Sequence, residues 1–187
     1  MHIVLIKGRK RVGKNTVADY IVEKLPNKAI LIPNAKAVKE EAYDMFDWNG
    51  EKDEKGRQLL VDITNTGYNY DNYFWEKRTL ETIIEAKRQN AELEVVVIPD
   101  WRYSQTKEFF SNVQSDFLGE IVVHTVTVNK LMKPEELFNC SSEVFRSETQ
   151  LDGEETDFEI NNNSTILDLQ LQLDEKLIGY LNSLINE

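Results

Sequence analysis

The chain has 187 residues, of which 41% are hydrophobic and 29% are charged, and this composition is typical of one globular domain with a core of its own. Its formal net charge of −11 argues against a nucleic-acid partner, because proteins that bind a polyanion normally carry a basic face. No apolar run has the length of a membrane span, and the N-terminal residues do not form a signal peptide. One cysteine and two histidines exclude a disulfide framework and argue against a cysteine- or histidine-rich metal centre. We therefore expect a cytoplasmic protein (in the host cytoplasm if viral) without a membrane or nucleic-acid partner.

In chain order, short apolar runs alternate with segments of helical periodicity. The strands are expected at residues 2–7, 29–32, 94–98, 121–128 and 158–161. The helices are expected at residues 14–25, 38–48, 57–63, 73–90, 106–117 and 166–185. This alternation predicts a single α/β domain over residues 1–187, with a parallel central sheet and helices on both faces. Residues 129–155 show no clean period and are interpreted as a lid or flap.

The first strand–helix junction carries a phosphate-loop pattern. Gly8, Gly13 and Lys14 have the spacing G-x-x-x-x-G-K between a buried strand and a helix. Glycines let backbone N–H groups curl around phosphates, and the lysine reaches the β- and γ-phosphates of a bound nucleotide. The residue after the lysine is usually Ser or Thr, but here it is Asn15, followed by Thr16. The alternative is a glycine-containing turn with a chance lysine.

With these residues in view, the chain resembles the bacteriophage deoxynucleoside monophosphate kinases, which have a three-layer P-loop NTPase fold. Residues 8–21 resemble the family pattern G-x-K-R-x-G-K-D-T-x-A-D-x-I, in which Asp commonly stands where this chain has Asn15. Further short matches follow in the family's order, at residues 35–39, 57–60, 71–75, 97–102, 146–148 and 157–162. The resemblance implies ATP-dependent phosphorylation of (deoxy)nucleoside monophosphates to diphosphates, with Mg²⁺ as the cofactor. Relatives also suggest a homodimer.

The chemistry of phosphoryl transfer and the resemblance together assign roles. Catalytic roles are expected for Lys14, Asp100 and Arg102, and tentative metal contacts for Asn15 and Asp100. The expected ATP-binding residues are Gly8, Lys10, Arg11, Val12, Gly13, Lys14, Asn15, Thr16 and, by resemblance, Asn162. The expected acceptor-binding residues are Lys39, Arg57, Tyr70, Asp71, Trp75, Arg102 and Arg146.

Other interpretations of these residues remain open. Asp100 also suits a helix N-cap, the basic residues a solvated face, and the aromatic residues core packing. Two other functions also remain open: a P-loop kinase for another small acceptor such as dephospho-coenzyme A, and a nucleotide-binding module with weak transfer activity. The sequence does not identify the preferred base or sugar.

Overall fold

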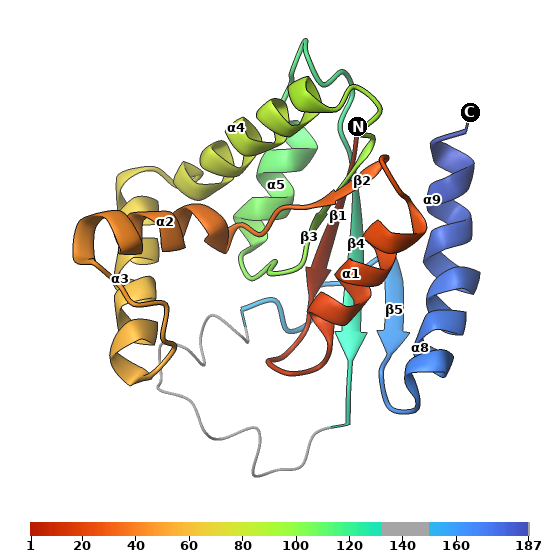
Figure 1. Cartoon of the computed structure of the whole chain (residues 1–187), viewed down its shortest axis with the longest axis horizontal. Helices are drawn as coiled ribbons and strands as arrows, with labels where there is room; N and C mark the ends of the chain where they lie inside the picture. Colours follow the sequence, from red (N-terminus) through yellow and green to blue (C-terminus); the bar gives the residue numbers. More distant parts are fainter. Residues whose placement is uncertain (132–149, 187) are drawn as a thin grey trace.

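A computed structural model describes residues 1–131 and 150–186 (Figure 1). Its described part contains one five-stranded sheet in the order β2-β3-β1-β4-β5, with every pair of neighbours parallel. The strands are β1 (His2–Lys7), β2 (Ala29–Leu31), β3 (Val95–Ile98), β4 (Val122–Asn129) and β5 (Phe158–Asn161). The predicted parallel sheet is confirmed, and its carboxyl ends all lie at one edge, at the arrowheads in Figure 1.

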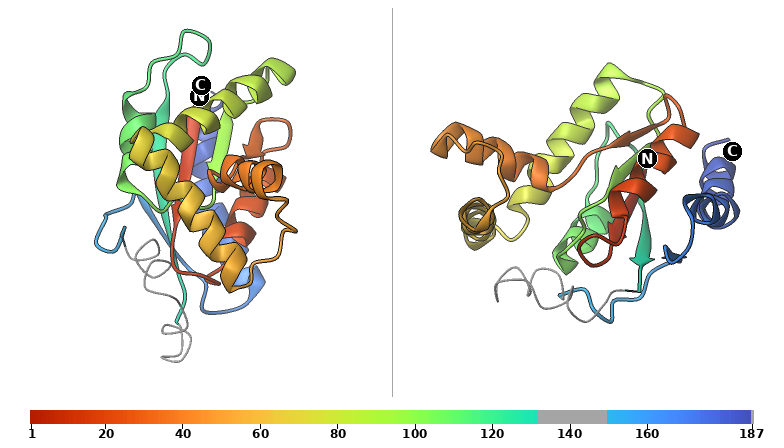
Figure 2. Two further views of the ribbon diagram at one scale, coloured as in Figure 1. Left: turned by 90° about the vertical axis from the view of Figure 1, so that its left-hand side faces the viewer. Right: turned by 60° about the horizontal axis from the view of Figure 1, so that its bottom comes forward.

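Helices cover both faces of the sheet (Figure 2). They are α1 (Lys14–Lys24), α2 (Ala35–Phe46), α3 (Glu54–Tyr70), α4 (Phe74–Gln89), α5 (Ser104–Asn112), α8 (Ile166–Leu173), η1 (Asp174–Ile178) and α9 (Gly179–Leu184). Alternation along β1 divides the core, since Val4 and Ile6 pack with α1 and the C-terminal helices, whereas Ile3 and Leu5 pack with α4 and α5. None of the helices in the described ranges is long and apolar enough to cross a bilayer.

A third, smaller cluster joins α2, α3 and α4 at one side of the sheet, to the left in Figure 1. Its buried members are Ala37, Val38 and Trp75. Gly67 lets α3 approach closely, because a Cβ atom there would lie 2.5 Å from the Trp75 Nε1 atom. These three helices therefore form a wall beside the carboxyl edge of the sheet.

Four helices differ from the sequence prediction. The helix predicted at residues 38–48 is α2, which spans Ala35–Phe46. The helix predicted at residues 57–63 is α3, which begins earlier because Asp53 caps it by accepting from the Gly56 N–H group (2.7 Å). It continues to Tyr70, with Ile63 and Tyr68 packed against the third cluster. The helix predicted at residues 106–117 is α5, which ends at Asn112 and gives way to a turn between Ser115 and Gly119.

The predicted C-terminal helix is interrupted by a π-helical turn, η1. Its buried residues recur every four positions, at Leu169, Leu173, Leu177, Leu181 and Ile185. A regular α-helix repeats every 3.6 residues, so a four-residue period would drift around its surface. The wider π-turn adds a residue and returns these side chains to the core.

Candidate active site

The phosphate loop connects β1 to α1, and its backbone needs glycine at two points. Gly8 has φ +143° and Gly13 has φ +102°, and a Cβ atom on Gly8 would lie 2.4 Å from the Val128 carbonyl oxygen. The Lys14 Nζ atom donates to the carbonyl oxygens of Gly8 (2.7 Å) and Arg9 (2.9 Å), so its side chain folds back over the loop. The first turn of α1 has no acidic residue and no side-chain cap, which leaves its N–H groups suited to an anion.

Asn162 supports this loop from the connection between β5 and α8. Its Nδ2 atom donates to the Val12 carbonyl oxygen (2.9 Å). A Cβ atom on Gly13 would lie only 2.5 Å from this Nδ2 atom. The resemblance implies that Asn162 binds ATP, and in the structure its side chain is bound to the loop backbone. Thr16 lies in a groove between α1 and α8.

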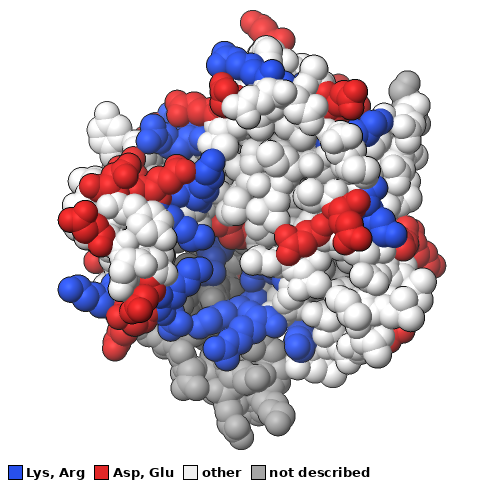
Figure 3. Space-filling view, in the orientation of Figure 1, with Lys and Arg blue, Asp and Glu red and all other residues white. Residues whose placement is uncertain are grey.

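The main cavity, of about 520 Å³, lies between the phosphate loop, the ends of β2 and β3, and helices α2 and α3. Its basic residues are Lys10, Arg11, Lys14, Lys39, Lys52, Arg57 and Arg102, and its acidic residues are Asp19 and Asp100. Figure 3 shows lysine and arginine side chains gathered around this hollow. Burial lowers the pKa of Lys52, and the like charges of Lys39 and Arg102 lower it further. The cavity is thus cationic in a protein of net charge −11.

One face of α3 lines the main cavity from end to end. Its lining residues are Arg57, Leu60, Val61, Thr64 and Tyr68, which follow the spacing of a single helical stripe. At a rise of 1.5 Å per residue, the Cα atoms of Arg57 and Tyr68 are about 16 Å apart. The Tyr68 and Tyr103 rings meet edge to face at 5.0 Å, and buried Trp75 lies beside them in the wall. The stripe therefore runs from a cationic residue to an aromatic surface.

Asp100, immediately beyond β3, caps α2 as well as lining the main cavity. Its Oδ1 atom accepts from the Asn34 N–H group and its Oδ2 atom from the Ala35 N–H group, both at 2.9 Å. The helix-cap interpretation thus describes its hydrogen bonds, while each oxygen keeps a lone pair for a further contact.

The donor set around Asp100 fits Mg²⁺ held mainly by a nucleotide. Mg²⁺ usually keeps several waters and binds through one or two carboxylates plus substrate phosphates. Asp100 and Asn15 line the same cavity as Lys14 and supply such oxygens. The described residues contain no group of three or more His, Cys, Asp and Glu side chains that could hold a metal alone.

The structure brings most of the predicted residues together. Around the main cavity lie Lys10, Arg11, Lys14, Asn15, Lys39, Arg57, Trp75, Asp100 and Arg102. Gly8 and Val12 belong to the loop but face the second cavity described below, and Arg146 lies outside the described residues.

Tyr70 and Asp71 differ from the expectation because they do not line the main cavity. Tyr70 is 84% exposed at the end of α3. Asp71 accepts from the Tyr73 N–H group (2.8 Å) and pairs with Lys77, so it supports the start of α4. Lys52 and Tyr68 were not predicted as site residues. The lysine-rich composition of residues 51–57 was a signal for Lys52, but the local sequence does not say which lysine turns inward.

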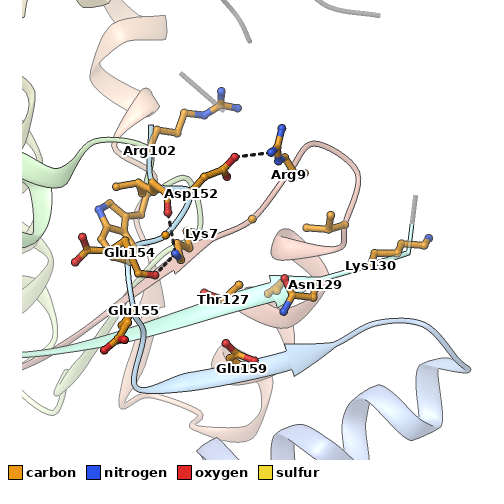
Figure 4. Close-up of a pocket in the computed structure, with 16 residues that line it drawn as sticks. Lys7, Arg9, Arg102, Thr127, Asn129, Lys130, Asp152, Glu154, Glu155 and Glu159 are labelled. Atoms are coloured by element: carbon orange, nitrogen blue, oxygen red, sulfur yellow. Dashed lines mark hydrogen bonds and ion pairs between the residues drawn. The ribbon is translucent and has the colours of Figure 1, made fainter. Parts of the chain in front are cut away.

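A second cavity, of about 450 Å³, lies on another side of the phosphate loop (Figure 4). Here the buried Lys7 ammonium donates to the carbonyl oxygens of Leu151 (2.9 Å) and Glu154, and burial lowers its pKa. Arg9 forms an ion pair with Asp152 (2.5 Å). These contacts attach the end of the predicted flap to the start of the loop, and Arg102 lines both cavities.

The fold is similar to that of a solved small-molecule kinase. A dephospho-CoA kinase from Campylobacter jejuni superposes with a TM-score of 0.55 at 13% identity, over 98% of each chain. The fold is that of the P-loop kinases. Matches with lower TM-scores include a shikimate kinase from Aquifex aeolicus (0.44, 18% identity, 97% of this chain and 99% of that one) and an unliganded sugar kinase from a Janibacter species (0.46, 12%, 95% and 96%). No protein-family model and no curated protein sequence matches the chain. At 13% identity the similarity to the dephospho-CoA kinase shows a shared fold, and a fold by itself does not determine the reaction.

Proposed function

We propose that the chain is an ATP-dependent kinase that converts (deoxy)nucleoside monophosphates to diphosphates. One observation carries this proposal: the phosphate loop and a second group of cations share a single cavity. Lys14 belongs to the loop, whereas Lys39, Lys52 and Arg57 come from α2, α3 and the connection between them. Two groups of cations in one cavity suit a reaction in which both the donor and the acceptor carry phosphate.

The shape of the cavity supports a nucleotide as the acceptor. Arg57 and Tyr68 lie at opposite ends of the α3 stripe, so the lining changes from cationic to aromatic along α3. A nucleoside monophosphate has the matching form, with an anionic phosphate at one end and a flat base at the other. Base–aromatic stacking contributes about 1–3 kcal/mol per base. A polyhydroxylated sugar would instead need polar partners along the wall where Leu60 and Val61 stand.

The expected roles follow from this placement. Lys14 and the N–H groups at the start of α1 would hold the donor phosphates, and Arg102 would bind the acceptor phosphate or the transferring group. Asn15 and Asp100 would contact Mg²⁺ or its waters, and Mg²⁺ supplies neutralisation of charge on the phosphate oxygens when bound. The protein's contribution is to hold two phosphates in line, because phosphoryl transfer requires mainly positioning and charge stabilisation.

The resemblance to the bacteriophage deoxynucleoside monophosphate kinases supports the same acceptor class. On the same resemblance we also propose that the chain forms a homodimer. A second candidate acceptor is dephospho-coenzyme A, which the similarity to the Campylobacter jejuni enzyme favours. That acceptor also combines phosphates with an adenine base, so the main cavity does not discriminate against it.

A coupled ADP-release assay tests the proposal. ATP and Mg²⁺ would be supplied with each deoxynucleoside monophosphate, with each ribonucleoside monophosphate and with dephospho-coenzyme A, and a reaction without acceptor would measure ATP hydrolysis. We expect turnover with at least one monophosphate. Turnover with dephospho-coenzyme A alone would select the second candidate, and measurable ATP binding without turnover of any acceptor would reject both.

The phosphate-loop assignment has a variant of its own. Lys14→Ala should lower kcat at least about a hundredfold, because it removes a cation that acts on the transferring charge. Lys24→Ala, in the last turn of the same helix and outside the main cavity, is the matched control and should keep full activity. A Lys14→Ala protein with normal turnover would refute the assignment.

A further inference from the structure

A buried carboxyl group lies behind the aromatic wall of the main cavity. Glu76 stands in the first turn of α4, and its side chain is 0% exposed. Its Oε1 atom accepts hydrogen bonds from the hydroxyl groups of Tyr68 (2.9 Å) and Thr106 (2.7 Å). Its Oε2 atom is also buried and has no hydrogen-bond partner. A buried polar atom without a hydrogen-bond partner lowers the stability of the fold, so its presence calls for an explanation.

The surroundings of Glu76 favour its neutral form. Burial raises the pKa of this carboxyl group, and the hydroxyl groups of Thr106 and Tyr68 offset only part of that effect. Other titratable groups nearby include Asp71, whose negative charge raises the pKa of Glu76 further, and Tyr103, whose own pKa is raised mainly by burial. Neutral Glu76 still accepts from Tyr68 through its carbonyl-type oxygen, so the hydrogen bond does not depend on a charge.

Glu76 acts together with its neighbour on the same helical face. Thr79 lies three residues further along α4, and its hydroxyl donates to the Asn34 Oδ1 atom (2.9 Å). Asn34 in turn donates its N–H group to Asp100. One buried stripe of α4 therefore holds both sides of the main cavity, Tyr68 in the aromatic wall and, through Asn34, the Asp100 edge.

We propose that Glu76 is a positioning residue for the acceptor half of the main cavity, acting by holding the Tyr68 hydroxyl so that the ring forms the wall. The inference rests on the proposed function, because the wall matters to turnover only if an acceptor binds against it. Tyr68 sits near the end of α3, and its hydroxyl bond to Glu76 ties it to α4. Without that bond the ring would lose its fixed direction, and acceptor binding would weaken while ATP binding at the phosphate loop would not change.

The test measures the KM of the best deoxynucleoside monophosphate, the KM of ATP and kcat for four variants. Glu76→Ala should raise the acceptor KM about tenfold and leave the ATP KM within about twofold. Glu76→Gln keeps an oxygen acceptor in the same place and should restore the acceptor KM to within about threefold of wild type. Tyr68→Phe should raise the acceptor KM several-fold. Tyr20→Phe is its matched control, because it also removes a hydroxyl that donates to an acidic side chain (Asp174, 2.9 Å) but lies away from the cavity. Its acceptor KM should remain at the wild-type value.

The outcomes separate the inference from the proposed function. A wild-type enzyme that phosphorylates no monophosphate rejects the proposed function and this inference with it. An active wild type in which Tyr68→Phe and Tyr20→Phe have the same acceptor KM overturns the inference alone, even if Glu76→Ala does not fold. Equal increases in the KM of ATP and of the acceptor, or a Glu76→Gln variant as impaired as Glu76→Ala, would also overturn it.

Discussion

A pair of stacked histidines on β1 and β4 makes the stability of the fold depend on pH. His124 on β4 is 4% exposed, and its ring stacks on His2 of β1 with centroids 5.3 Å apart. One hydrogen bond joins the His2 Nδ1 and His124 Nε2 atoms (3.1 Å), so at least one of these nitrogens has to be unprotonated. Burial, with the second ring adding to it, lowers the pKa of His124 from 6.5 to about 4. Asp157 opposes that shift.

The sign and size of the effect follow from proton linkage. The unfolded chain binds a proton at this residue below pH 6.5, whereas the folded chain binds one only near pH 4. The contribution of His124 to stability is therefore fully present above pH 6.5 and is lost as the pH falls from 6.5 towards about 4. Each pH unit inside the window costs about 1.4 kcal/mol, so the His124 contribution to the unfolding free energy should fall by about 2 kcal/mol between pH 7.5 and pH 5.

Urea unfolding at pH 7.5, 6 and 5 would measure this loss for the wild type and for His124→Asn. The variant removes the titrating group, and its unfolding free energy should be lower at pH 7.5 but change less with pH. The carboxylate of Asp157, whose pKa is lowered by its bonds to Thr125, titrates below this range and adds little to the slope. Equal pH slopes for the two proteins would refute the reasoning.

Two further predictions concern the main cavity. Asp100→Asn should lower the unfolding free energy by about 1–2 kcal/mol without any nucleotide present, because an amide provides only one acceptor oxygen for the Asn34 and Ala35 N–H groups. An unfolding free energy in urea equal to that of the wild type would show that Asp100 does not stabilise the start of α2. Lys52→Ala should raise the KM of the acceptor about five- to tenfold at low salt. Lys55→Ala is the control, because it removes a lysine outside the cavity lining, and it should leave this KM unchanged. Equal acceptor KM values for the two variants would show that Lys52 does not reach the acceptor.

The phosphate loop was predictable because its determinants are contiguous. Gly8, Gly13 and Lys14 stand between one apolar strand and one amphipathic helix, and the backbone angles at both glycines are those the pattern requires. The parallel sheet was predictable for a similar reason, since continuous apolar runs alternate with helical segments. Both features depend on local sequence and on the rule that parallel strands need helical crossovers.

The acceptor side of the cavity depends on rotation about helices, which local sequence determines poorly. Tyr68 and Tyr70 are two residues apart, but on an α-helix they point about 200° apart. Tertiary contacts, among them the packing of Gly67 against Trp75 and the hydrogen bond from Tyr68 to Glu76, make Tyr68 face the cavity while Tyr70 faces solvent. A periodic pattern identifies the helix, and tertiary contacts choose its phase.

Glu76 shows the same limit for a charged residue. An acidic side chain in the first turn of a helix is ordinarily read as a solvated residue that favours the helix N-terminus. Here α3 and α5 close over it, and only their meeting brings the Tyr68 and Thr106 hydroxyls to its oxygen. Burial of a polar group is a property of the assembled layers, so no sequence window contains it.

By itself the sequence determined the strand–loop–helix unit that can hold phosphate, the parallel α/β fold and the acidic balance of the chain. The tertiary structure alone decided that cations from the phosphate loop, α2, the start of α3 and the end of β3 share one cavity, and that Asp100 caps α2 while facing that cavity. The physical reason is distance along the chain: helical and strand periodicity is set by residues only a few positions apart. The cavity joins residues from Lys10 to Tyr103, which become neighbours only when the layers pack.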